Sequence, residues 1–196
     1  MRIVISEFMS LDGVVQAPGG VKEDTDGGFQ HGGWSMRFFD PDVMGAAIGA
    51  VAERTDALLY GRRTWQGMAA AWPGRAGDPF ADWINGVEKY VVSSTLSASD
   101  LTWQPTTLIA GNALLDAVAE LRDRPGRDVN IMGSPQLART LLSADLVDEL
   151  NLMIEPIVLG GGKGIFPADG VARTFALVSA ATTSTGVQVC RYQRVQ

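Results

Sequence analysis

Short apolar runs with strand character alternate with segments of helical spacing, and this alternation restricts the possible folds more than any other feature of the sequence. It is typical of α/β proteins, in which successive strands lie parallel in one sheet. The strand-like runs are residues 2–9, 57–60, 89–93, 107–109, 128–132, 147–159, 175–183 and 187–194. Because the last two are adjacent, they predict an antiparallel hairpin turned at Thr185-Gly186. We therefore expect an α/β fold with a mostly parallel central sheet and an antiparallel C-terminal hairpin.

Helix signals separate most of these strands. Asp40 is placed to cap a helix that opens at Pro41, and Thr64 is placed to cap a short helix that ends near Ala71. Further helices are expected over residues 79–85 and 114–121 and from Pro135 onward. The glycine- and proline-rich stretch 12–33 predicts a long loop, and loops of that length often cover binding sites.

Composition narrows the class of protein. The 196 residues are 46% hydrophobic and 19% charged, which is typical of a folded chain, and we expect one domain over residues 1–196. The formal net charge of −6 argues against a nucleic-acid partner, and no apolar run is long enough for a membrane span. A single cysteine, Cys190, and a single histidine, His31, argue against disulfides and structural zinc. The expected setting is the cytoplasm, with no metal.

Two strand ends turn through glycine into a helix. The first is Gly133-Ser134-Pro135, where Ser134 would cap the helix and the remaining first-turn N–H groups would form an anion site. The second is Gly61-Arg62-Arg63-Thr64, where two arginines stand beside the helix start and suit phosphate. Each junction is also compatible with a capped helix that binds nothing and with arginines that are merely solvated.

A third strand ends in the hydroxyl residues Ser93 and Ser94 rather than in an acid. Dinucleotide folds that prefer NAD present Asp or Glu to the ribose hydroxyls. If a dinucleotide binds here, hydroxyls near two arginines favour one with a 2′-phosphate. The alternative is an ordinary polar turn.

Three further features of the sequence bear on a binding site. The run Gly160–Gly164 lacks the spacing of a phosphate loop, so its glycines are expected to let the backbone pass close to a neighbouring segment. Asp12, in the turn after the first strand, is the candidate for substrate contact or proton relay, although a water would serve equally well. Trp34, at the far end of the long loop, is the candidate for stacking on a planar substrate.

The order of these motifs resembles the dihydrofolate reductase fold. The closest branch is the C-terminal reductase domain of the bifunctional riboflavin-biosynthesis deaminase-reductase. The matching segments are Ser10-Leu11-Asp12-Gly13, Gly61-Arg62-Arg63-Thr64-Trp65, Val91-Val92-Ser93-Ser94, Ile131-Met132-Gly133-Ser134-Pro135, Leu146-Val147-Asp148-Glu149-Leu150 and Pro156-Ile157-Val158-Leu159-Gly160. The likeness spans nearly the whole chain and implies a three-layer fold.

The resemblance also implies NADPH as the cofactor, lying across the sheet. Arg62, Arg63 and Thr64, with Gly61 at the turn, would then hold phosphate groups. Ser93 and Ser94 would lie near the adenosine 2′-phosphate. Gly133, Ser134, Pro135 and Gln136 would receive the pyrophosphate. The resemblance and the exposed edge of the C-terminal hairpin together suggest a homodimer.

Two positions depart from the family pattern. Dihydrofolate reductases carry an acid on the first helix, and that place falls near Met44 and Gly45 here. The riboflavin reductase domain usually has Glu before its glycine turn, where this chain has Met132. The first departure argues against folate reduction, and the second weakens the assignment to the specific riboflavin step.

The leading hypothesis is an NADPH-dependent reductase that transfers hydride to a small heterocyclic substrate. It resembles 5-amino-6-(5-phosphoribosylamino)uracil reductase of riboflavin biosynthesis. The alternatives are a non-catalytic nucleotide-binding module of the same fold and a dihydrofolate or pteridine reductase. A further alternative is an acyl hydrolase, but the sequence has no G-x-S-x-G nucleophile motif to support it.

Overall fold

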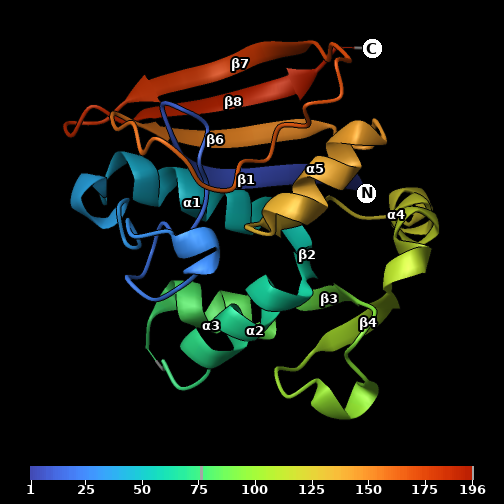
Figure 1. The fold of residues 1–196 in the computed structure, drawn as a ribbon. Helices are drawn as coiled ribbons and strands as arrows, with labels where there is room; N and C mark the ends of the chain where they lie inside the picture. The colour runs from blue at the N-terminus through green and yellow to red at the C-terminus, as the bar shows by residue number, and fades with distance from the viewer. Residues whose placement is uncertain (76, 196) are drawn as a thin grey trace.

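The computed structural model describes residues 1–75 and 77–195 and is organised around one eight-stranded sheet (Figure 1). The strand order is β4-β3-β2-β5-β1-β6-β8-β7. The strands are β1 (Arg2–Ser10), β2 (Thr55–Gly61), β3 (Glu88–Ser93), β4 (Thr106–Ala110), β5 (Asp128–Met132), β6 (Glu149–Glu155), β7 (Phe175–Thr182) and β8 (Gln188–Arg194). The helices are α1 (Val43–Arg54), α2 (Arg62–Ala71), α3 (Pro79–Gly86), α4 (Leu114–Asp123) and α5 (Pro135–Ser143).

The sheet is parallel except at one side. Strands β4, β3, β2, β5, β1 and β6 all run in the same direction, whereas β8 pairs antiparallel with both β6 and β7. The predicted α/β fold with an antiparallel C-terminal hairpin is therefore confirmed. The hairpin turns at the expected place, where Gly186 has a φ of +85°.

Helices cover both faces of the sheet and make it the middle of three layers. On one face, α4 and α5 contribute Val118 and Leu141 to a core with Ile3 and Ile5 of β1. On the other face, α2 and α3 pack Trp65 and other side chains against Leu58 and Tyr60 of β2, and α1 lies on the same side. The alternation of inward-facing side chains along each strand places one apolar set on each face.

The first helix is tied to the C-terminal hairpin through one carboxylate. Oδ1 of Asp40 accepts the N–H groups of Asp42 and Val43, so it binds the start of the helix as expected, but α1 begins at Val43 rather than at Pro41. Oδ2 of the same residue accepts both the N–H and the hydroxyl of Ser184 in the β7–β8 turn. These bonds lower the pKa of Asp40, so the carboxylate stays ionised and holds both elements.

One predicted strand is shorter than expected. The run 147–159 was predicted as one strand, but β6 covers only Glu149–Glu155. Pro156 has no N–H to give to a ladder, so the strand ends before it. The residues beyond it form a turn that packs against the end of β1.

A buried lysine fixes α3. Lys89 of β3 is completely buried, and its Nζ donates to the carbonyls of Ile84, Asn85 and Val87 at distances of 2.7–3.1 Å. The ammonium also lies 4.5 Å from the ring centre of Trp103. Burial lowers the pKa of Lys89 to about 8. Because these carbonyls lie at the end of α3, the lysine sets the position of that helix.

Replacing Lys89 with Met is expected to lower the free energy of unfolding by about 2–3 kcal/mol, because buried carbonyls lose a charged donor. Urea denaturation followed by circular dichroism measures the effect. Lys22→Met is the matched control, since Lys22 is exposed, and it should change stability by less than about 0.5 kcal/mol. Equal stability of the two variants would contradict the anchoring role.

Candidate functional site

The two glycine turns predicted to bind anions meet at the carboxyl edge of the sheet. Strands β2 and β5 are neighbours, so the turns that follow them lie side by side. The N–H of Gly61 donates to Oγ of Ser134 at 2.7 Å. Two junctions that lie 73 residues apart in the chain therefore form a single site.

The structure corrects the helix caps predicted at these two turns. Ser134 is buried with a φ of +64°, and its hydroxyl accepts the Gly61 N–H instead of capping α5. The helix α2 begins at Arg62, so Thr64 lies inside its first turn and does not cap it. Instead, Thr64 packs against Gly133, where an added Cβ would lie only 3.0 Å from its methyl carbon. The Gly61–Ser134 hydrogen bond and the Thr64–Gly133 contact hold the two turns together. Because Thr64 lies so close, position 133 has no room for a residue larger than glycine.

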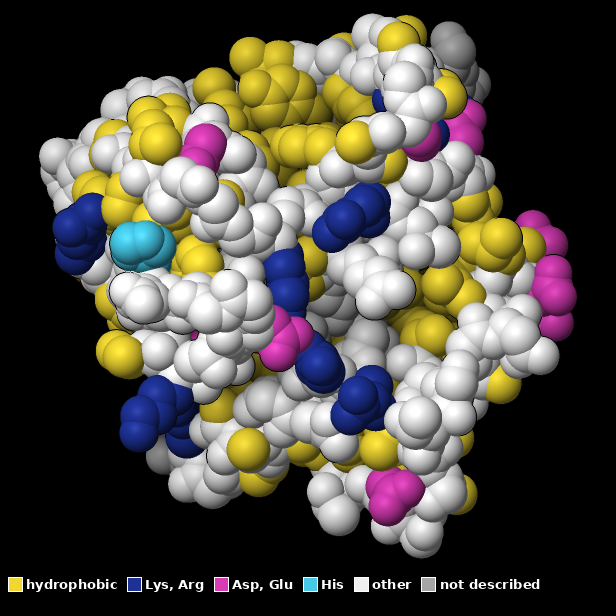
Figure 2. Space-filling model, in the orientation of Figure 1, with side chains coloured by type: hydrophobic (Ala, Val, Ile, Leu, Met, Phe, Trp, Pro, Cys, Tyr) yellow, Lys and Arg dark blue, Asp and Glu magenta, His cyan; other side chains and the backbone are white. Residues whose placement is uncertain are grey.

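The starts of α2 and α5 carry the features of an anion site. Neither helix has a side-chain cap, so the first-turn N–H groups keep their capacity to bind a ligand. Arg62 bonds Gln66 of its own helix at 3.1 Å, and Arg63 pairs with Asp26. On the face drawn in Figure 2, Lys and Arg side chains gather over the region between α5 and α2.

The long loop closes over this edge through ion pairs. Nζ of Lys163 lies 2.5 Å from Asp24 and 2.9 Å from Asp26, and Asp26 also pairs with Arg63. An incoming phosphate would therefore compete with the Asp26 carboxylate for Arg63. The glycine run passes close to the loop as predicted, because a Cβ on Gly164 would lie 2.8 Å from the Gly13 carbonyl oxygen.

The predicted 2′-phosphate residues lie on the next strand. Strand β3 pairs with β2 up to Gly61 and Val92, so Ser93 and Ser94 follow directly beyond that pair. The Ser93 hydroxyl accepts the N–H groups of Thr95 and Leu96 at 3.0 Å and is buried. Ser94 is exposed, and its side chain lies against Gly111, which follows β4. Gly111 is one more glycine at a strand end, and no motif in the sequence indicated its contact with Ser94.

Asp12 and Trp34 are held by contacts within the protein. The Asp12 carboxylate accepts the Ser10 hydroxyl and the N–H groups of Leu159 and Gly160, and these bonds lower its pKa. This arrangement ties the turn after β6 to the end of β1 and keeps the carboxylate ionised. The Trp34 ring is only 5% exposed, and its N–H donates to the Gln16 carbonyl. Roles in proton relay for Asp12 and in substrate stacking for Trp34 stay predictions.

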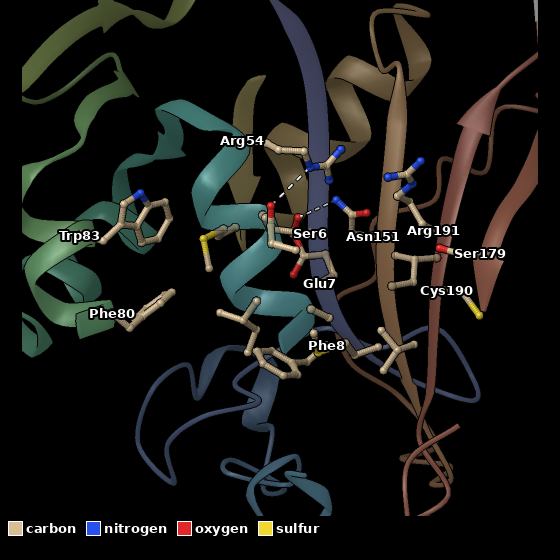
Figure 3. A pocket seen from close by; sticks show the side chains of 18 residues that line it. Ser6, Glu7, Phe8, Arg54, Phe80, Trp83, Asn151, Ser179, Cys190 and Arg191 are labelled. Atoms are coloured by element: carbon tan, nitrogen blue, oxygen red, sulfur yellow. Dashed lines mark hydrogen bonds between the residues drawn. The ribbon is translucent and has the colours of Figure 1, made fainter. Parts of the chain in front are cut away.

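A cavity of about 220 Å³ lies between the sheet and helices α1 and α3 (Figure 3). Its walls are largely apolar, with Phe80 and Trp83 from α3, Phe8 from β1 and Met132 at the end of β5. Met132 precedes the Gly133 turn, so the cavity adjoins the anion site. Apolar pockets with a few convergent polar groups are the usual form of small-molecule sites.

The polar floor of this cavity was not foreseen from the sequence. Strand pairing places Ser6, Asn151, Arg191 and Ser179 opposite one another across β1, β6, β8 and β7. The Asn151 amide donates to Ser6 Oγ at 3.3 Å, and Ser6 donates to Asn130 Oδ1 at 2.9 Å. Each of these residues is a polar side chain in a strand of its own, and the sequence alone does not show that the four meet across the sheet.

Two arginines border the same floor. Arg54 at the end of α1 and Arg191 of β8 both line the cavity. Buried Glu149 lies 3.0 Å from the Arg54 guanidinium and 4.0 Å from that of Arg191. A single carboxylate thus orients two positive side chains beside the cavity.

Two further carboxyl groups are buried near the carboxyl edge. Glu155 accepts the Ser35 hydroxyl at 2.5 Å, and burial raises its pKa to about 7. Burial raises the pKa of Glu7 well above its usual value.

A second cavity of about 290 Å³ lies beside Trp34 and is bordered by His31 and Arg37.

The described part of the chain offers no cluster of three or more His, Cys, Asp or Glu side chains that would hold a metal ion. Among the helices that the structure describes, none has the length and apolar character to cross a membrane.

Comparisons with known proteins agree with this geometry. Residues 2–189 match the family model described as the RibD C-terminal domain. The uncharacterized protein YyaP of Bacillus subtilis (strain 168) is 27% identical over 191 residues, which cover 95% of this chain and 91% of YyaP. These matches confirm the resemblance inferred from the order of the motifs.

Solved structures share the fold. A putative riboflavin biosynthesis protein from Shewanella sp. PV-4 superposes with a TM-score of 0.76 at 21% identity, with all of both chains covered. Dihydrofolate reductase from Enterococcus faecalis, solved in complex with NADP(H), gives a TM-score of 0.60 at 14% identity and covers 100% of this chain and 97% of its own. The solved structures show a shared fold, and the family whose model matches points to reductase-type oxidoreductases.

The bond between the two turns can be tested with a pair of variants. Ser134→Ala removes the acceptor of the Gly61 N–H and keeps a Cβ at a φ of +64°, so it should lower the free energy of unfolding by about 1–3 kcal/mol. Ser134→Gly also lacks the hydroxyl but relaxes this backbone, so it should be about 1 kcal/mol more stable than the Ala variant. Urea titrations measure both, and an Ala variant as stable as the parent would contradict the docking role.

Proposed function

The chain belongs to the RibD C-terminal domain family, and we propose that it is an NADPH-dependent reductase that transfers hydride to a small heterocyclic substrate. One observation carries the proposal. The Gly61–Ser134 hydrogen bond brings together the starts of α2 and α5, which have no side-chain cap, and two arginines lie beside them. Cationic groups and free N–H donors at adjacent strand ends suit the phosphates of a dinucleotide.

The residues at the edge fit such a cofactor. Gly133 has a φ of +78° and packs against Thr64, so glycine is required at this turn, which lies at the strand end where a phosphate would bind. Gln136 is exposed in the first turn of α5, and Pro135 gives that turn a fixed φ. We assign the pyrophosphate to Gly133, Ser134, Pro135 and Gln136. A reduced nicotinamide supplies the hydride when bound, and the protein's part is to bind and orient the reactants.

The phosphate preference depends on the arginines. Arg62 and Arg63 follow β2, next to the end of β3 where Ser93 and Ser94 lie. No acidic side chain ends β3, which would otherwise favour the free ribose hydroxyls of NADH. We therefore propose that Arg62 and Arg63, with Thr64 in the same turn, contact phosphate groups, including the 2′-phosphate.

The cavity beside Met132 is the proposed substrate site. Its volume of about 220 Å³ fits one small ring system, and Ser6 and Asn151 offer hydrogen bonds to polar ring atoms. Arg54 and Arg191 would suit an acidic group on the substrate, such as the phosphate of a phosphoribosyl-pyrimidine. The α1 residues that line the cavity are Ala47, Ile48, Ala50, Val51 and Arg54, so no carboxylate on this helix is available to hold a pterin.

A homodimer remains part of the proposal. Strand β7 forms one edge of the sheet, and its side chains include the exposed Leu177 and Val178. Figure 2 shows hydrophobic side chains gathered over β7 and β8. An exposed edge with apolar side chains is a surface on which a second copy can pair.

The double substitution Arg62→Ala with Arg63→Ala tests the cofactor assignment. We expect the Kd for NADPH to rise about 10- to 100-fold and that for NADH only a few-fold, because charged hydrogen bonds to the 2′-phosphate are lost. Nicotinamide fluorescence titrations provide the Kd values. Arg127→Ala, a surface arginine at the opposite edge of the sheet, is the control and should change neither value.

Equal weakening for the two nucleotides would contradict the 2′-phosphate assignment. Turnover is measured with the same parent protein by nicotinamide absorbance, using a panel of phosphoribosyl-pyrimidines and pterins. Oxidation of NADPH with a pyrimidine supports the reductase. Tight binding without oxidation across the panel would instead favour the non-catalytic nucleotide-binding module.

A further inference from the structure

Glu7 is an acidic residue in β1, one of the two strands at the centre of the sheet. Its side chain is only 6% exposed, and Oε1 has no hydrogen-bond partner among the described residues. Buried carboxyl oxygens nearly always find a partner, because an unpaired one loses its hydration without compensation. The other buried acid at this edge, Glu155, has the Ser35 hydroxyl on its Oε1.

The position of Glu7 follows from where two strands end. Strand β1 pairs with β5 only from Arg2 to Ser6, whereas its pairing with β6 continues to Ser10. Glu7 is the first residue beyond the last β1–β5 pair, Ser6 with Met132. It therefore stands beside Gly133, where β5 ends and the chain turns toward α5.

The side chain of Glu7 faces this turn. Ile5 and Met9 of β1 belong to the core beneath α4 and α5, whereas Ser6 and Phe8, with Glu7 between them, line the cavity on the other side of the strand (Figure 3). Alternation along the strand nevertheless places the Glu7 side chain on the α5 side. The Gly133 backbone lies close enough to the carboxyl group to lower the Glu7 pKa, although burial raises that pKa by more.

The surroundings of Glu7 contain little that would stabilise a negative charge. Its neighbours on the flanking strands, Gly133 after β5 and Leu152 of β6, carry no charge. Glu23 of the long loop is the charged group that acts on it, and its negative charge adds to the effect of burial in raising the Glu7 pKa. A neutral carboxylic acid has one oxygen that accepts and an O–H group that must donate.

We propose that Glu7 is a ligand-binding residue of the dinucleotide site, whose carboxylic O–H donates a hydrogen bond to an oxygen of the nucleotide as it passes over Gly133. The inference rests on the proposed function, because it needs a dinucleotide at the start of α5. It adds a residue that no sequence motif indicated. It also explains why a carboxyl group is present at a site that otherwise attracts anions. The neutral Glu7 carboxyl group donates a hydrogen bond to a nucleotide oxygen, whereas an ionised Glu7 would repel that oxygen.

The test compares NADPH binding by the parent, Glu7→Gln and Glu7→Leu from pH 6.5 to pH 9.5, with fluorescence titration as the readout. Gln keeps the shape and a donor but cannot ionise, whereas Leu lacks the donor. The ratio of the parent Kd to the Gln-variant Kd cancels the titration of the ligand itself. We expect this ratio to rise at least 5-fold with pH, and Glu7→Leu to bind at least 5-fold more weakly than Glu7→Gln.

A second readout uses no ligand. Because the folded state raises the pKa of Glu7, the parent should lose stability relative to Glu7→Gln as the pH rises from about 4.5 through the folded-state pKa. Thermal unfolding over this range measures the difference and shows whether each variant is folded. If the difference in Tm between the parent and Glu7→Gln stays constant with pH, Glu7 is not the neutral acid that the proposal requires.

The remaining outcomes separate the two proposals. A ratio of Kd values that stays constant with pH, together with equal binding by the Leu variant, would overturn the role of Glu7 and leave the cofactor assignment standing. Failure of the parent itself to bind NADPH or NADH would overturn the proposed function, and the role of Glu7 with it.

Discussion

The hydrogen bond from the Gly61 N–H to the Ser134 hydroxyl is the contact on which the site depends. It joins the ends of β2 and β5, which are adjacent only because β5 enters the sheet between β2 and β1. This insertion brings together two helix starts from distant parts of the chain. Their dipoles and free N–H groups then act on the same region of space, beside Arg62 and Arg63. Without this strand order, each turn would be an ordinary helix start.

The same insertion creates the second half of the site. Since β5 ends at Met132 while β1 continues to Ser10, the edge of β1 beyond Ser6 has no strand beside it toward β2. The anion site lies at the α5 turn, and the cavity lies on the α1 side of the same strand ends. Lys89 holds α3 and its aromatic residues at the cavity wall, and Glu149 holds Arg54 and Arg191 at its floor. A reductase needs such an arrangement, because the cofactor and the substrate must bind side by side for hydride transfer.

Much of the fold could be predicted from local patterns. Apolar runs, glycine turns and the Asp40 bonds depend on neighbouring residues, so the order of strands and helices along the chain and the C-terminal hairpin were predicted correctly, whereas the bounds of β6 and α1 were not. The partners of Ser134 and Thr64 are distant in sequence, and local capping rules therefore assigned them wrongly. The cavity floor requires the order and register of four strands, which a single sequence does not contain. Glu7 was missed because a lone acid in a strand shows neither its burial nor its lack of a partner.

The most direct test of the account is a crystal structure of the protein with NADPH. The account predicts pyrophosphate oxygens at the starts of α2 and α5, over Gly133 and beside Arg62 and Arg63, with the nicotinamide end toward Met132 and Glu7. It also predicts that Asp26 no longer pairs with Arg63. A nucleotide bound instead in the cavity beside His31 and Arg37, with the two helix starts still covered by the long loop, would contradict it.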